Sequence, residues 1–187
     1  MISLRPGMLY SSTIFISSAM LLVLEIVAGR LLAPYVGVSL YTWTSIIGVI
    51  LAGLSLGNWF GGKLADSNAS HITVGVVLLG SAVTSLGVLP LLVLLGTVIQ
   101  EQGLSPLAAS FWFVLGLFFV PAVLLGILSP LLTTLYLHHD SRTGTIVGRM
   151  HALSAIGSIV GTFLTGFVLI QWVGTRAIVI MVPVRES

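Results

Sequence analysis

The sequence predicts an all-α integral membrane protein, a bundle of five full transmembrane helices followed by a short apolar stub at the C-terminus. Hydrophobic residues make up 57% of the 187 residues and charged residues only 6%, against about 25% charged in a typical soluble domain. The mean hydropathy is +1.16. A soluble core of this size does not need so much apolar surface, so the bilayer is the expected partner of most side chains.

The first two predicted spans are separated by a turn and followed by a polar loop. The first covers 8–33 and closes at Pro34 and Gly37, residues that favour a turn. The second covers 38–61. The stretch "GGKLADSNASH" at 61–71 is polar, and we expect it to be a loop between the second and third spans.

The remaining spans follow the same pattern. The third covers 72–98, with Pro90 as an expected kink. The fourth covers 106–128 and begins with Pro106, which suits the first position of a helix. The fifth covers 145–173. All five lie in a single transmembrane domain, 1–187.

The apolar segment 177–184 is too short to cross the membrane. A helix of this length covers about 12 Å, under half of the hydrocarbon core. We interpret it as the first turns of a sixth helix that stops early. Basic residues in short loops favour the cytoplasmic side, and their distribution predicts a cytoplasmic N-terminus. We expect the membrane to be a bacterial inner membrane. The predicted inner side holds Arg5, Lys63 and Arg142, with Arg149 close to it, and the outer side holds Arg30 and Arg176.

Glycines spaced by four residues recur in the second and fifth spans. Residues four apart lie on one helix face, where small side chains allow two backbones to approach closely. Packing inside one bundle is the favoured interpretation, and a contact face for a second copy or a partner chain is the alternative. The glycines are Gly53, Gly57 and Gly61 in the second span and Gly144, Gly148, Gly157 and Gly161 in the fifth.

The first span carries two charges with different explanations. Arg30 lies near the outer end of its helix, and its long side chain can reach the interface as an anchor. Glu25 lies deeper, and intramembrane carboxyls are costly and usually functional. It either pairs with Arg149 or His151 of the fifth span, is protonated in a cavity as in a proton-coupled carrier, or donates a buried hydrogen bond. Trp43 begins the second span near Arg30, where a tryptophan typically anchors a helix.

Several kinds of chemistry have no support in the sequence. The chain has no cysteine, which excludes disulfides and thiolate sites. It has too few basic residues for nucleic-acid binding, and no glycine loop for a nucleotide. Adjacent His138 and His139 in a loop point apart, so we expect no metal site. We therefore expect no cofactor and no enzymatic activity in this chain.

Two stretches resemble a known family. "LEIVAGRLLAPYVGVSLYTWTSIIGVILAGLSLGNWFGGKLAD" (24–66) and "GRMHALSAIGSIVGTFLTGFVLIQWVGTR" (148–176) are similar to the N-terminal membrane domain of spermidine synthase-like proteins, fused major-facilitator/spermidine-synthase proteins. "GGKLAD" also resembles the cytoplasmic loop motif of major-facilitator transporters, where Lys63 and Asp66 would help to cap helix ends. The resemblance implies a domain like half of a major-facilitator transporter, and we expect the synthase domain to be absent.

Three functions remain open. The first is a half-transporter-like protein that moves a small solute as a homodimer or with a partner chain. The second is a non-catalytic accessory or scaffold subunit of a larger membrane complex. The third is a membrane partner of a separate synthase chain. Intramembrane Glu25 favours the first, and the expected early end of the sixth helix favours the second.

Overall fold

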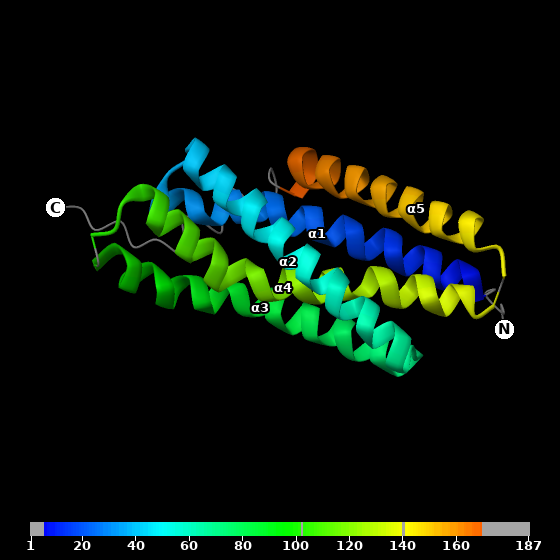
Figure 1. Cartoon of the computed structure of the whole chain (residues 1–187). Helices are drawn as coiled ribbons and strands as arrows, with labels where there is room; N and C mark the ends of the chain where they lie inside the picture. The colour runs from blue at the N-terminus through cyan, green and yellow to red at the C-terminus, as the bar shows by residue number, and fades with distance from the viewer. Residues whose placement is uncertain (1–5, 102, 140, 170–187) are drawn as a thin grey trace.

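The computed structural model describes residues 6–101, 103–139 and 141–169, which form an elongated bundle of long helices (Figure 1). Within these ranges, five helices are long and apolar enough to cross a membrane, which confirms the predicted multi-pass helical fold. The elements are α1 (Pro6–Val36), α2 (Leu40–Asn68), α3 (His71–Glu101), α4 (Pro106–Leu137), α5 (Thr143–Leu164) and the π-helix η1 (Thr165–Leu169).

Helix α4 forms the centre of the bundle. It contacts each of the other four long helices and packs most extensively against α2. Its apolar side chains fill the core along the whole length of the helix, from Phe113 and Phe118 near one end to Leu131 and Leu135 near the other. The position of every other helix is therefore defined by its packing on α4 or on a neighbour of α4.

The turn after α1 lies close to the predicted place. Helix α1 passes through Pro34 and ends at Val36, and Gly37 has a positive φ of 74°. Glycine adopts this left-handed conformation without steric cost, so it ends the helix. Ser39 then caps α2 by accepting a hydrogen bond of 3.2 Å from the backbone N–H of Thr42.

The stretch 61–71 is helical over most of its length, which differs from the predicted loop. Helix α2 continues to Asn68, and α3 begins at His71, where Ser70 accepts a 3.1 Å hydrogen bond from the backbone N–H of Thr73. The polar stretch stays helical because its charged residues lie on the exposed face while Ala65 is buried. Lysine, leucine and alanine, which follow one another in this stretch, are good helix formers.

The fourth helix also differs from its predicted bounds, and the fifth begins at Thr143, two residues before its predicted start. Helix α4 passes through Pro130 and ends at Leu137, nine residues beyond the predicted 128. Burial of Leu131, Leu132 and Leu135 stabilises this extension, since tertiary packing outweighs the lost backbone hydrogen bond of a proline. The end of the predicted fifth span, to 173, and the predicted stub 177–184 lie outside the described residues.

The glycines of α2 face α4 within the same chain. A Cβ atom at Gly53 would lie 2.9 Å from the Cβ of Ala122, and one at Gly61 would lie 2.7 Å from the carbonyl oxygen of Ile127. A Cβ at Gly57 would overlap the carbonyl oxygen of Val123. The absence of side chains at these three positions therefore allows α2 and α4 to pack backbone against backbone.

The fifth helix uses only half of its glycines in this way. Gly157 packs against the backbone of Phe15 and Gly161 against that of Ala19, where a Cβ would overlap the carbonyl oxygen in each case. The two contacts advance together along both chains, so α1 and α5 run parallel and lie side by side (Figure 1). A Cβ at Gly144 or Gly148 would meet no atom within 4 Å, so these two glycines face outward.

Substitution of Gly161 tests the close contact of α1 and α5. Gly161→Leu should destabilise the protein by about 1–3 kcal/mol, because the added side chain overlaps the α1 backbone. Gly148→Leu, on the same helix but in open space, is the matched control and should change stability little. Thermal unfolding in detergent measures both, and equal effects of the two variants would contradict the packing described.

Candidate functional site

Glu25 lies on the side of α1 that faces α5. It follows Ser18 by seven residues, which places both on one face of the helix, and the Ser18 Oγ lies 2.8 Å from the Oγ of Ser154 on α5. From the contact of Ala19 with Gly161, six further residues along both parallel helices bring Glu25 to the level of η1. Glu25 is therefore level, along the bundle, with the only π-helical turn in the part of the chain that the structure describes.

The carboxyl of Glu25 is partly buried, and no described residue forms a hydrogen bond or ion pair with it. The charge nearest in sequence, Arg30, is exposed. The ring of Trp43 covers Gly29, since a Cβ there would lie 3.0 Å from the ring. Trp43 thus packs on α1 next to Arg30, in the region where the sequence analysis expects both to anchor the helix end.

The structure does not bring Glu25 together with Arg149 and His151. Arg149 lines a pocket with Ser11, which precedes Glu25 by fourteen residues, or about 21 Å along the helix. His151 is exposed on the outside of α5. The three residues therefore do not form one polar site.

The physical reason for this correction is the length of the helices. The predicted closeness of Glu25 and Arg149 assumes helices that are as long as the hydrocarbon core is thick, about 30 Å. It places Glu25 by its distance from the outer helix end and Arg149 by its distance from the inner one. Helix α1 has 31 residues, or about 46 Å. Because α1 and α5 also begin at the same end of the bundle, Arg149 stays near that end while Glu25 lies two-thirds of the way along α1.

Polar aromatic residues gather at the end of the bundle where α1, α3 and α5 begin, here called the Tyr10 end. Tyr10 is only 4% exposed. Its ring stacks on His71 of α3 with centroids 5.7 Å apart, and its hydroxyl lies 3.4 Å from the Nε2 of His71. The ring also contacts Tyr136 of α4 and His139 in the turn that follows α4, at centroid distances of 6.0 and 5.8 Å. Three helices are thus joined around one tyrosine.

Arg149 connects α5 to the same end. Its Nη1 donates a hydrogen bond of 3.3 Å to the hydroxyl of Tyr136. This cluster does not follow from the sequence, because Tyr10, His71 and Tyr136 lie far apart in the chain. The position of each close to a span end is the one signal that would have suggested it, since such residues favour the membrane interface.

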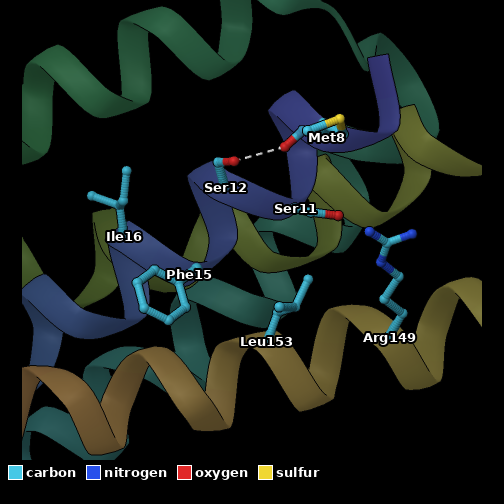
Figure 2. A pocket seen from close by; sticks show the side chains of 7 residues that line it. All are labelled: Met8, Ser11, Ser12, Phe15, Ile16, Arg149 and Leu153. Carbon is cyan, nitrogen blue, oxygen red and sulfur yellow. Dashed lines mark hydrogen bonds between the residues drawn. The ribbon is translucent and has the colours of Figure 1, made fainter. Parts of the chain in front are cut away.

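A pocket of about 420 Å³ opens between α1 and α5 beside this cluster (Figure 2). Arg149 and Ser11 lie toward one end of it, and Phe15 and Ile16 toward the other. Ser11 is 6% exposed, and its Oγ has no hydrogen-bond partner. The residues that line the pocket are Met8, Ser11, Ser12, Phe15, Ile16, Arg149 and Leu153.

The loop-motif residues Lys63 and Asp66 both lie on the exposed face of α2. The Nζ of Lys63 lies 3.6 Å from the centroid of the Trp59 ring, a cation–π contact. The side chain that caps α3 is Ser70, and no hydrogen bond of Asp66 is found within the described ranges. The capping role implied by the resemblance therefore has no counterpart among these contacts.

Metal ligands do not converge in the described part of the chain, where no group of three or more His, Asp and Glu side chains lies close enough to hold an ion. The Nδ1 of His139, in the turn after α4, lies 2.9 Å from the carbonyl oxygen of Leu135 in the last turn of α4. His138 caps α4 through its backbone N–H.

Comparison of the chain with protein-family models, curated proteins and solved structures finds no match. The resemblance to the membrane domain of spermidine synthase-like proteins stays a prediction from residues 24–66 and 148–176. Functional inference therefore depends on the chemistry of the two polar regions, Glu25 at the level of η1 and the Tyr10 end.

The Tyr10 cluster predicts a structural effect that can be measured. Tyr10→Ala should destabilise the protein by up to about 3 kcal/mol, because it leaves a cavity among three helices. Tyr41→Ala removes the same atoms from an exposed position on α2 and should have little effect. Thermal unfolding of the two variants in detergent compares them, and similar losses would show that the cluster contributes nothing specific.

Proposed function

We propose that this multi-pass membrane protein moves a proton or a small cationic solute across the bilayer, as a half-transporter-like domain that works as a homodimer or with a partner chain. The observation that carries the proposal is the partly buried carboxyl of Glu25, which lies within a membrane-spanning helix and has no polar partner among the described residues.

The cost of burial supports a working role for this carboxyl. A charged group inside the bilayer is unfavourable by several kcal/mol, so it is rarely present unless it pairs or binds something. Arg149 and His151 are too far away to compensate it, and Arg30 is exposed. A proton or a cation that reaches Glu25 would neutralise it.

The backbone at the level of Glu25 is also irregular. At this level α5 gives way to η1, which contacts α1. Thr165 is buried, and its hydroxyl donates a hydrogen bond of 2.7 Å to the carbonyl oxygen of Gly161. It is a polar group at the level of Glu25 along the interface between α1 and α5, here called the seam.

A second chain supplies what one bundle lacks. Facilitator transporters hold their substrate between two repeats, so each repeat forms one wall of the site. This bundle leaves large apolar side chains exposed on both α3 and α5. Gly157 and Gly161 pack against α1 of the same chain. A second copy would therefore contact the opposite, outward face of α5.

Substitution of Glu25 tests the proposal. In liposomes with a pH-sensitive dye inside, Glu25→Gln should lower flux by about 100-fold, the scale for losing a positioned proton-transferring group. Glu25→Asp keeps a carboxyl and should retain much of the flux, and both variants should unfold at a temperature close to that of the unsubstituted protein. Flux that is unchanged by Glu25→Gln would refute the mechanism.

A groove between α2 and α4 favours the second candidate, an accessory subunit of a membrane complex. It has a volume of about 390 Å³, and small residues on α2 form part of its wall. Such a groove accepts a bulky apolar side chain from a helix of another subunit. The residues that line it are Thr44, Ser45, Gly48, Val49, Ala52, Leu107, Phe111, Leu115 and Phe119.

Isolation in mild detergent distinguishes the two candidates. Co-purification with other membrane subunits in fixed stoichiometry, lost on Gly48→Phe, would support the accessory role. Gly75→Phe, at a glycine of α3 that also faces open space, is the control and should leave the complex intact. A homodimer alone argues for the transporter, and a co-purified soluble synthase chain would support the third candidate, which rests on the sequence resemblance.

A further inference from the structure

We propose that the pocket between α1 and α5 at the Tyr10 end binds an anionic phospholipid, with the lipid phosphate at Arg149 and Ser11 and the start of an acyl chain along Phe15 and Leu153. This binding site is separate from Glu25 and does not depend on transport. It lies about 21 Å from that carboxyl along α1.

Arg149 provides the charge. It is exposed, and the 3.3 Å bond from its Nη1 to Tyr136 uses one of five guanidinium donors. The remaining donors suit phosphate oxygens, which arginine binds through charge-assisted hydrogen bonds. The pocket lining contains no carboxylate that would compete for them.

Ser11 provides a second polar group. Its neighbours in α1 donate their hydroxyls back to the helix, Ser12 to the carbonyl oxygen of Met8 at 2.8 Å and Thr13 to that of Leu9 at 2.9 Å. Ser11 does not, and its enclosed Oγ is left without a partner. Figure 2 shows this hydroxyl directed toward the guanidinium of Arg149 across the pocket. Buried hydroxyls normally find a partner, so an unpaired one at a pocket wall indicates a missing ligand.

The rest of the pocket identifies that ligand as an amphiphile. Phe15 and Ile16 lie one to two turns further into the bundle than Ser11, and Leu153 lies one turn further than Arg149. The polar groups thus face the membrane surface, and the apolar groups extend toward its centre. A free phosphate ion would leave this apolar wall uncovered, whereas a phospholipid covers it with its acyl chain.

The helix dipoles favour the same ligand. Helices α1 and α5 run parallel and both begin at this end, so the positive ends of two dipoles face one membrane surface. Basic residues between transmembrane helices bind anionic lipid head groups, and Arg149 adds such a charge at this end. The pocket is open on one side, which gives a lipid a route to Arg149.

Native mass spectrometry of the full chain in detergent tests the proposal with dioleoylphosphatidylglycerol as the probe. Arg149→Gln should weaken binding by about tenfold, the loss expected for one charge-assisted hydrogen bond. Arg149→Lys should recover part of it. Arg30→Gln removes the same charge from α1 outside the pocket and should leave the affinity unchanged. Equal affinity of Arg149→Gln and the unsubstituted protein would overturn the proposal.

Two further variants separate binding from folding. Ser11→Ala should weaken lipid binding while leaving the unfolding temperature unchanged or raised, whereas a purely structural hydroxyl predicts unchanged binding. Leu153→Trp fills the apolar part of the pocket without altering any charge, so it should also reduce binding. Lipid binding that is unaffected by both variants would contradict the assigned site.

Two other probes identify the source of the phosphate. Dioleoylphosphatidylcholine, which has no net charge, should bind more weakly than the anionic lipid. Inorganic phosphate at millimolar concentration should neither displace the lipid nor raise the unfolding temperature. Equal binding of the two lipids would contradict recognition of the lipid's negative charge. Displacement of the lipid by phosphate would show that the site binds free anions instead.

Discussion

The close approach of the α1 and α5 backbones at Gly157 and Gly161 determines where the polar groups of this protein lie. A lipid environment provides little hydrophobic drive between helices, so van der Waals contact between backbones becomes the main source of packing energy. These two contacts join the helices in one parallel register. The same principle applies at Gly57, where the backbone of α2 packs directly against the central helix α4.

That register separates two kinds of polar chemistry along one seam. At the Tyr10 end, Arg149 and Ser11 face each other across an open pocket. Two-thirds of the way along α1, Glu25 lies at the level of η1 without a polar partner among the described residues. We propose that the first region takes a lipid head group and the second a proton or a cation. Under this proposal, α1 and α5 hold two sites that do not touch each other.

The hydropathy of the chain was sufficient to predict five membrane-spanning helices, because length and apolar content decide this by themselves. Helix ends were harder to predict. The polar stretch 61–71 resembles a loop in composition, yet its helix persists because Ala65 packs inward. Helix α4 passes through Pro130 because the residues beyond it are buried. The relative depth of Arg149 and Glu25 depends on the register of two helices, which only their mutual packing reveals.

The register itself is the claim to test first, and the lack of cysteine in the chain makes disulfide trapping clean. The Oγ atoms of Ser18 and Ser154 lie 2.8 Å apart, so the double variant Ser18→Cys/Ser154→Cys should form a disulfide in mild oxidant, which electrophoresis after proteolysis between α1 and α5 would detect. Glu25→Cys/Arg149→Cys should not, since bridged Cα atoms must lie within about 7 Å. A disulfide in the second pair and none in the first would contradict the account.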